Sequence, residues 1–208
     1  STFVILSVAA ALFFVAGARL WHLLLGLIIG SATIGLLIIS ASYRMKRVAA
    51  FLNPEDDPLG IGWHVSQSAI ALGSGGLFGR GLGASRQKFY YLPNAHTDAI
   101  FPVIGEELGF IGSMVVVALF LFVAYRGYSL ANRAPDSYGA LIVVGITFWL
   151  VGQALINIGV VTALVPFTGI PLPFVSFGGS SLIVSMAAVG ILLNISRQSS
   201  NANRAVTK

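Results

Sequence analysis

One aspartate, Asp98, is a candidate for chemistry because of its neighbours in the sequence. His96 and Thr97 precede it, and an apolar segment begins near Phe101. A carboxylate at the point where a polar loop meets a membrane is partly desolvated, which makes it a stronger base. Asp98 could therefore accept a proton in general base catalysis. The alternative is a helix cap, in which its carboxylate binds the first backbone N–H groups of the following helix.

Positively charged side chains occur in the same polar stretch as Asp98. This stretch runs from Arg44 to Ile100 and contains six basic residues, which suit an anionic substrate such as a phosphate ester. With His96 beside Asp98, the candidate substrate-binding residues are Arg80, Arg86, Lys88, Arg44, Lys46 and Arg47. The last three directly follow the second apolar segment, so anchoring to lipid headgroups is their alternative role.

Three further polar residues are candidates for a supporting role. Glu106 and Glu107 lie one to two turns inside the apolar segment that follows Asp98. A charge at the centre of a membrane helix costs roughly 2.5–3.5 kcal/mol on insertion scales, so such residues usually face a cavity or pair with a cation. A buried salt bridge and a supporting catalytic role both fit these glutamates. Ser176 lies in a loop rich in Pro and Gly, where its hydroxyl can bind nearby backbone.

The composition indicates an integral membrane protein. The 208 residues are 56% hydrophobic and only 9% charged, whereas about a quarter of a soluble domain is charged. Cysteine is absent, which excludes disulfides and Cys-based metal sites, and the three histidines are scattered, so we predict no metal-ligand set. The sequence pI is near 9.9, but no aromatic residues alternate with the basic ones, so we expect no nucleic acid partner.

Five segments are apolar and long enough to span a bilayer as helices, which takes about 20 residues. Helices are required because lipid offers the backbone no hydrogen-bond partners, and no segment alternates like a barrel strand. We therefore predict an all-α integral membrane protein, a polytopic helix bundle with about five transmembrane spans. The predicted spans are Thr2–Gly17, Trp21–Ala41, Phe101–Ala124, Tyr138–Val165 and Ser180–Ile195.

The positions of Lys and Arg predict the orientation, because short loops with many basic residues are cytoplasmic. One side of the membrane would hold Arg19, Arg126, Arg133, Arg197, Arg204 and Lys208, whereas the loop at 166–179 on the other side has no Lys or Arg. The predicted organisation is two transmembrane helices in 1–43, an extracytoplasmic catalytic loop in 44–100, three transmembrane helices in 101–197 with an outer Pro/Gly loop at 164–179, and a cytoplasmic tail in 198–208.

The long loop contains two recognisable segments. Trp63–Leu72 predicts a short amphipathic helix at the membrane interface. Six glycines follow between Gly73 and Gly83, in a spacing that fits neither a P-loop nor G-x-G-x-x-G, so we expect a tight loop packed against other backbone. Later in the chain, Gln153 and Asn157 share one helix face, which predicts hydrogen bonds between helices rather than a cavity lining.

Several motifs resemble the FtsW/RodA/SpoVE (SEDS) family. They are PLPFVSFGGSS at 171–181 followed by VGILLNISR at 189–197, QS at 67–68, GSGGLFG at 73–79, GLGASRQKFYYLP at 81–93, HTD at 96–98 and GEELG at 105–109. The similarity runs from about Tyr43 to Arg197. The segment SRQK at 85–88 resembles the cell-division FtsW branch more than the elongation RodA branch.

The resemblance implies a ten-span glycosyltransferase that polymerises lipid II into peptidoglycan glycan strands at the outer face of the cytoplasmic membrane during septal cell-wall synthesis. This chain would be its C-terminal half, with Asp98 as the essential loop aspartate. The implied partners are lipid II, a class B penicillin-binding protein (a single-pass transpeptidase), other division proteins and membrane lipid. The family usually has Glu where Asn94 stands and an aromatic residue where Ala99 stands, so that acid and that packing contact are not expected here.

The implied chemistry agrees with the residues present. Lipid II carries its sugar on a lipid pyrophosphate, a good leaving group once cations meet its charge. One carboxylate then suffices, as general base on the acceptor 4-hydroxyl of an inverting transfer. A divalent cation, Mg or Mn, could share the pyrophosphate, with Asp98 or a glutamate as partial ligand. Two other functions fit the chain: a lipid II flippase, or a non-enzymatic divisome scaffold for a class B penicillin-binding protein.

Overall fold

The computed structural model describes residues 2–40, 45, 51, 61–87 and 96–206. Its elements are all helices, which confirms the predicted all-α fold in the described part of the chain. In chain order they are α1 (Thr2–Val15), α2 (Leu20–Ile39), α4 (Ile61–Ser74), α6 (Ile100–Ala131), α7 (Ser137–Val161) and α8 (Gly179–Val206).

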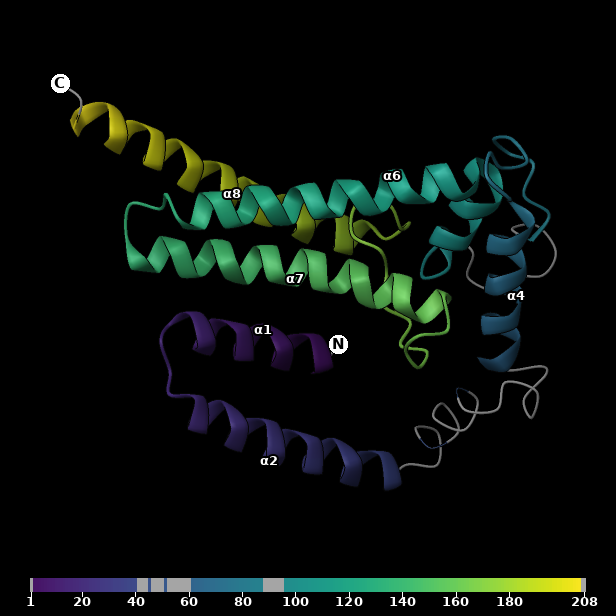
Figure 1. Cartoon of the computed structure of the whole chain (residues 1–208), viewed down its shortest axis with the longest axis horizontal. Coiled ribbons are helices and arrows are strands. Elements are labelled where there is room, and N and C mark those ends of the chain that lie inside the picture. The colour runs from purple at the N-terminus through teal and green to yellow at the C-terminus, as the bar shows by residue number, and fades with distance from the viewer. Residues whose placement is uncertain (1, 41–44, 46–50, 52–60, 88–95, 207–208) are drawn as a thin grey trace.

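Helix α7 lies at the centre of the bundle and contacts α1, α4, α6 and α8 (Figure 1). The turns at 16–19 and 132–136 lie together at one end of the bundle. Helix α4, the 96–99 turn and the loop at 162–178 lie at the other end (Figure 1). Arg19 and Arg133 belong to the first group, so these basic residues and Asp98 are at opposite ends of the molecule.

Three helices are long and apolar enough to cross a membrane: α6, α7 and the Gly179–Asn201 part of α8. The apolar stretches Val4–Val15 and Leu24–Thr33, in α1 and α2, are shorter. The chain is therefore a multi-pass membrane protein, with three spans that meet this criterion among the described residues instead of the predicted five. All five predicted segments nevertheless form helices.

The helix ends differ from the predicted spans. Helix α6 continues to Ala131, beyond the predicted end at Ala124, and α8 continues to Val206, so described residues of the predicted tail are helical. A helix can extend past the apolar core of a bilayer, where hydropathy no longer marks its end. Helix α7 begins where the Asp136 side chain accepts a hydrogen bond from the Gly139 backbone N–H at 3.1 Å, which is an N-cap.

The buried core joins α6 and α7 to the loop at 162–178. It consists of Phe101, Phe120, Ala154, Val161 and Leu172. Large apolar side chains on the outer faces of α2, α6 and α8 are exposed instead, which suits helices that face lipid because lipid tails are as apolar as these side chains. The core therefore fixes the end of the bundle that carries Asp98.

Helix α6 is interrupted at Gly109, whose φ of 71° and ψ of −166° are accessible essentially only to glycine. An unbroken helix would have backbone hydrogen bonds from residues 110 and 111 to the carbonyls of residues 106 and 107. Here the glycine-rich segment supplies the partners: N–H groups of Arg80 and Gly81 donate to these two carbonyls, both at 3.0 Å. In return, the Phe110 and Ile111 N–H groups donate to carbonyls of the same segment, at 2.9 and 3.3 Å.

Only glycines permit this close approach. A Cβ atom on Gly79 would lie 2.1 Å from the Glu107 carbonyl oxygen, and one on Gly75 would lie 1.9 Å from the Gly105 carbonyl oxygen. The prediction of a glycine loop packed tightly against other backbone is confirmed. We call residues 75–87 the glycine loop.

Helix α4 confirms the predicted short helix at 63–72, but its polar and apolar sides are not arranged as for a helix that faces water. Gln67 and Ser68 are buried, whereas Ala69 and Ile70 are exposed. Helix α4 packs against α6 and α7, and the side that faces protein holds both polar side chains, Gln67 and Ser68, and apolar ones, Val65 and Ala71.

Candidate active site

Asp98 lies in the 96–99 turn, immediately before α6, and its side chain is partly exposed. The Thr97 hydroxyl donates a hydrogen bond to Asp98 Oδ1 at 2.6 Å. The N-cap residue of α6 is Ala99, and no side chain caps this helix. The Asp98 carboxylate therefore does not cap α6, and the capping alternative is wrong.

The backbone of Asp98 is held from α7. Asn157 Nδ2 donates to the Asp98 carbonyl oxygen at 2.8 Å and to the Ile170 carbonyl oxygen at 2.7 Å. One turn earlier, Gln153 Nε2 donates to the Pro171 carbonyl oxygen at 2.9 Å. The prediction of interhelical hydrogen bonds for these two amides is wrong, because buried carbonyls of the non-helical segments need donors and take them.

Ser176 forms a second connection between the 162–178 loop and the 96–99 turn. Its hydroxyl donates to the Thr97 carbonyl oxygen and accepts a hydrogen bond from the Leu172 N–H at 2.7 Å. The Phe177 N–H donates to the His96 carbonyl oxygen at 2.8 Å. The turn that carries Asp98 is thus fixed on two sides, by α7 and by this loop.

Glu106 is fully buried, with 0% exposure, and its carboxylate organises the glycine loop. Oε2 accepts hydrogen bonds from the Ser85 hydroxyl at 2.6 Å and from the Gln87 N–H at 3.4 Å. Oε1 accepts from the Arg86 N–H at 3.1 Å and pairs with the Arg80 guanidinium at 3.5 Å. The structure thus contains the buried salt bridge that was one of the two roles considered for Glu106, and three further groups donate to the same carboxylate.

The structure describes only some of the basic residues predicted to bind substrate. Arg80 pairs with Glu106 while 41% of its side chain stays exposed, and the Arg86 side chain is exposed. The described residues show no ion pair between either arginine and Asp98. His96 is exposed and lies in the same turn as Asp98. Four predicted residues lie outside the described ranges: Lys88, Arg44, Lys46 and Arg47.

Glu107 differs from its neighbour. Its side chain is partly buried, and Oε1 has no hydrogen-bond partner within the described residues. Its backbone carbonyl accepts the bond from the Gly81 N–H. Glu107 thus binds the glycine loop through its backbone carbonyl. Its carboxylate has no set of hydrogen bonds within the described residues comparable to that of Glu106.

His64 belongs to the site although sequence reasoning missed it. It lies on the first turns of α4, and its ring stacks in a tilted arrangement on Phe167, with centroids 5.1 Å apart. Burial lowers the pKa of His64 from its usual value of 6.5, and the nearby Asp98 carboxylate partly opposes that shift. His64 and Asp98 are 34 positions apart in the sequence, so no local motif could reveal that the Asp98 charge acts on His64.

The described part of the chain holds no group of three or more His, Cys, Asp or Glu side chains able to enclose an ion. Mg²⁺ does not need such a group, because it often keeps several waters and takes one or two carboxylates plus substrate phosphates. Asp98, which is partly exposed, fits the role of a single carboxylate ligand.

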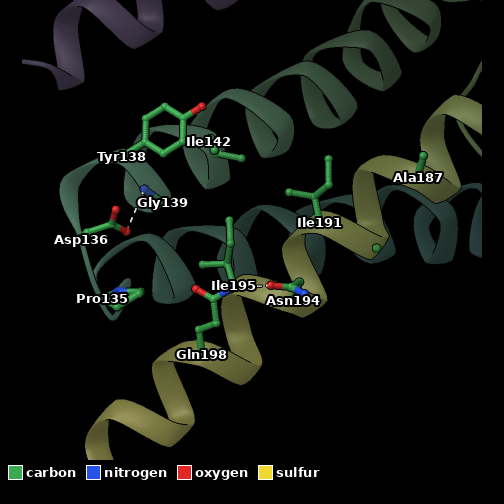
Figure 2. Close-up of a pocket in the computed structure, with 11 residues that line it drawn as sticks. Pro135, Asp136, Tyr138, Gly139, Ile142, Ala187, Ile191, Asn194, Ile195 and Gln198 are labelled. Atoms are coloured by element: carbon green, nitrogen blue, oxygen red, sulfur yellow. Dashed lines mark hydrogen bonds between the residues drawn. The ribbon is translucent and has the colours of Figure 1, made fainter.

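A pocket of about 510 Å³ lies between the first turn of α7 and the second half of α8 (Figure 2). Its polar lining includes Asp136, Asn194 and Gln198, while Ile142 and Ile191 are apolar (Figure 2). Asp136 already caps α7, and Asn194 accepts a hydrogen bond from Gln198 at 2.6 Å. None of the sequence-predicted site residues lines this pocket, which is separate from the Asp98 site.

Comparison with known proteins identifies the family. The model of the FtsW/RodA/SpoVE cell cycle proteins matches residues 1–201. The chain belongs to this family. The resemblance seen in the sequence motifs is thereby confirmed, and the family similarity includes the two helices that precede those motifs.

Relatives of known name support the same assignment. The chain is 53% identical over 197 residues to stage V sporulation protein E of Bacillus subtilis, which covers 94% of this chain and 54% of that protein. It is 48% identical over 190 residues to the probable peptidoglycan glycosyltransferase FtsW of Trichlorobacter lovleyi, covering 91% of this chain and 50% of that protein. The chain therefore spans about half the length of these relatives and is FtsW-like.

Two solved structures share the fold. A chain of a peptidoglycan synthase complex, whose structure concerns the coordination of polymerization and crosslinking, aligns with a TM-score of 0.73 at 29% identity. The alignment covers 95% of this chain and 55% of that one. An aspartate-to-alanine mutant of the rod shape determining protein RodA from Thermus thermophilus aligns with a TM-score of 0.59 at 28% identity, covering 94% and 49%.

Proposed function

We propose that the complete protein is a peptidoglycan glycosyltransferase that polymerises lipid II into glycan strands. Its membership of the FtsW/RodA/SpoVE family and the glycosyltransferase names of its FtsW relatives support this activity. The observation that carries the proposal is Asp98: a partly exposed carboxylate that caps no helix, on a turn fixed by Asn157 and Ser176. A rigid turn that presents one carboxylate is what general base catalysis requires.

In the proposed reaction, Asp98 takes the proton from the acceptor 4-hydroxyl as that oxygen attacks the anomeric carbon of the donor sugar. The bond between this carbon and the pyrophosphate oxygen breaks, and the lipid pyrophosphate leaves with the electron pair. Configuration at the anomeric carbon inverts because a single displacement occurs. The Thr97 hydroxyl, which donates to Oδ1, orients the carboxylate, so that Oδ2 is the oxygen assigned to the acceptor.

The negative charge of the departing pyrophosphate is assigned to the basic residues of the loop. Arg80 and Arg86 suit this role because both side chains are exposed while the Glu106 carboxylate fixes the loop that carries them. Lys88, Arg44, Lys46, Arg47 and His96 complete the proposed set. A divalent cation, Mg²⁺ or Mn²⁺, is proposed to neutralise further charge, held by Asp98 together with substrate phosphate and water.

The proposed setting is septal cell-wall synthesis at the outer face of the cytoplasmic membrane, with a class B penicillin-binding protein as partner. The FtsW relatives and the fold shared with a chain of a peptidoglycan synthase complex support this setting. The chain is also similar to a protein named for sporulation, stage V sporulation protein E. The chemistry at Asp98 would be the same in either setting.

The direct test compares lipid II polymerisation by the purified complete protein with that of its Asp98→Asn variant. We expect a loss of at least about 10²-fold, the low end of what general acid–base groups contribute. Asp136→Asn is the matched control, because asparagine caps a helix as well as aspartate does and this residue lies at the other end of the bundle. Equal glycan synthesis by all three proteins would remove Asp98 from the chemistry. Transport of lipid II without synthesis would indicate a flippase.

A further inference from the structure

The glycine loop runs along α6 for a short distance and then returns toward the start of that helix. Its residues 76 and 77 are level with 110 and 111, because their carbonyl oxygens accept hydrogen bonds from the Phe110 and Ile111 N–H groups. Its residues 80 and 81 are level with 106 and 107, to whose carbonyls they donate. Four residues of helix span about 6 Å. Leu77 and Phe78 are therefore the part of the loop that lies farthest along α6, and we call them the loop tip.

The side chains of the loop tip are large, apolar and exposed. Leu77 is 63% exposed and Phe78 is 80% exposed. Next to them on α6, Phe110 and Ile111 are exposed as well, at 57% and 50%. The exposed side of α6 continues at positions three or four residues apart, with Met114, Val115, Leu119 and Phe122. The loop tip thus extends the apolar outer face of a helix that is long and apolar enough to cross a membrane.

The charges on α6 indicate how deep the loop tip lies in a membrane. Between Glu107 and Arg126 there are 18 residues, and none of them is charged. As a helix this stretch is about 27 Å long, which is close to the hydrocarbon thickness of about 30 Å. Glu107 and Arg126 therefore mark the two boundaries of the apolar layer. Ile111, and with it the loop tip, lies about one turn inside the boundary at the Asp98 end.

The backbone of the loop meets the condition that lipid imposes. Lipid offers no hydrogen-bond partners, so irregular backbone at membrane depth is tolerated where protein satisfies it. Around the loop tip, the carbonyls of residues 75, 76 and 77 accept hydrogen bonds and the N–H groups of residues 79, 80 and 81 donate them, at 2.8–3.3 Å. All of these partners belong to α6 or to the loop itself. In water such pairing would not be required, because water could bind the exposed groups.

The charged residues of the loop lie nearer the boundary than its tip. Residues 75–79, GGLFG, have no polar side chain. The first charged residue, Arg80, is level with Glu106 and pairs with it, and the backbone of Arg86 binds the same carboxylate. At this level a membrane has its phosphate groups, which attract cations, while the apolar stems of arginines can lie along the acyl chains.

We propose that the loop tip is inserted among the lipid acyl chains of the membrane leaflet at the Asp98 end of the bundle. Leu77 and Phe78 contact the acyl chains, and Leu82, which is 80% exposed, lies nearer the headgroups. Transfer of the two tip side chains from water into lipid is favourable and holds the loop at this depth. The inference goes beyond the proposed function and does not rest on it, since a flippase with this fold would hold the loop in the same way.

The test measures the depth of nitroxide spin labels in the complete protein, with any cysteines outside these 208 residues replaced. Labels are attached to Leu77→Cys, Phe78→Cys and Leu82→Cys, one at a time, in vesicles of phosphatidylethanolamine and phosphatidylglycerol. Oxygen concentrates in the apolar layer, whereas a nickel chelate present on both sides stays in water. We expect oxygen collisions to exceed nickel collisions at Leu77 and Phe78. The ratio should fall from Leu77 to Leu82, because their partners on α6 are about 6 Å apart along the helix.

Asn132→Cys is the matched control. Asn132 is exposed in the turn after α6, beyond the charged residue Arg126, so nickel collisions should exceed oxygen collisions there. A second measurement keeps an aromatic ring at the tip: p-benzoylphenylalanine in place of Phe78 is irradiated in the same vesicles. The mass of the protein should rise by that of one phospholipid.

Three results would overturn the inference. Nickel collisions above oxygen collisions at Leu77 and Phe78 would place the loop tip in water. Low collision rates with both reagents, together with a cross-link from position 78 to protein instead of phospholipid, would mean that another part of the complete protein or a partner covers the tip. A higher oxygen ratio at Leu82 than at Leu77 would reverse the proposed depth. The proposed function fails separately, by an Asp98→Asn variant that still polymerises lipid II, because the depth measurement uses no lipid II.

Discussion

At the scale of single residues, two carboxylates at the start of α6 have opposite environments. Glu106 is fully buried and accepts from three donors besides its ion pair with Arg80, so its lone pairs are engaged within the protein. Asp98 is partly exposed, and within the described ranges its one side-chain donor is the Thr97 hydroxyl. A carboxylate whose acceptor sites are all in use stabilises a loop, whereas one with a site open to solvent can take a proton from a substrate.

The role of Glu106 can be tested by Glu106→Gln, which keeps the shape of the side chain. Each oxygen of Glu106 accepts from a backbone N–H, of Arg86 or Gln87, so the new NH₂ group must face a donor in either orientation. We expect the free energy of unfolding to fall by about 1–3 kcal/mol, the cost of unsatisfied buried polar groups. Thermal unfolding in detergent measures this loss, and lipid II polymerisation should fall with it because the glycine loop loses its fixed shape.

Glu107→Gln is the control for that change. Glu107 Oε1 has no hydrogen-bond partner in the described part of the chain, so neutralising this carboxylate removes no comparable set of bonds. We expect the control to unfold near the wild-type temperature. A Glu106→Gln variant as stable as Glu107→Gln would show that the Glu106 carboxylate does not hold the loop.

The sequence predicts a site residue when its local sequence context is informative, and it fails when the fold brings together residues that are distant in the sequence. Asp98 could be identified from its place between a polar loop and an apolar segment, and Ser176 from its loop. His64 could not, because only the fold brings α4 next to Asp98, and a histidine among apolar neighbours more often signals packing. The four donors around Glu106 were equally hidden, since backbone N–H groups of residues 86 and 87 leave no trace in residue type.

At the scale of elements, the break in α6 and the glycine loop are one structure. The loop takes over two helical hydrogen bonds, so neither segment could have this backbone without the other. The many glycines correctly indicated a close backbone contact. The position of the break was not predictable, because the apolar sequence around Gly109 is compatible with an uninterrupted helix and only the partner segment, about thirty residues earlier, makes the positive φ favourable.

Gly109→Ala tests this coupling. At Gly109 a Cβ atom would lie 2.3 Å from the Gly79 nitrogen, and the φ of +71° is strained for any other residue. We expect a destabilisation above about 1–3 kcal/mol, the usual cost of backbone strain alone, because the contact cannot relax without parting the two segments. The midpoint of thermal unfolding is the measurement, with polymerisation activity as a second readout.

Gly190→Ala is the matched control on α8. A Cβ atom there meets nothing within 4 Å, and alanine favours a helix over glycine by about 1 kcal/mol. The control should be as stable as the wild type or more so. If Gly109→Ala were as stable as Gly190→Ala, α6 could form an unbroken helix at no cost in stability. The hydrogen bonds between α6 and the glycine loop would then contribute nothing to the free energy of unfolding.

At the scale of the whole molecule, hydropathy predicted where the helices are but not all of their ends. The five apolar segments became α1, α2, α6, α7 and α8, because lipid requires the backbone to satisfy its own hydrogen bonds. Helix α6 runs past its apolar stretch to Ala131, and Gly127 within the added turns does not end it. The central position of α7 was not predictable, because all five segments are similarly apolar and only packing distinguishes them.

The arrangement of the bundle predicts which residues face each side of the membrane. Helix α4 and Asp98 lie at one end, and the turns with Arg19 and Arg133 lie at the other (Figure 1). Because these 208 residues contain no cysteine, single cysteines can be introduced without interference from this part of the chain. We choose Ser66, exposed on α4, and Ser200, exposed near the end of α8.

A membrane-impermeant maleimide should label the Ser66→Cys variant in right-side-out vesicles and the Ser200→Cys variant in inverted vesicles. Both variants should react in either preparation once detergent opens the membrane, which controls for buried thiols. The reason is electrostatic: the short loops on the Ser200 side carry the Lys and Arg residues that stay in the cytoplasm. The reversed labelling pattern would place Asp98 at the cytoplasmic face, where it could not extend glycan strands outside the cell, and the proposed function would fail at the level of topology.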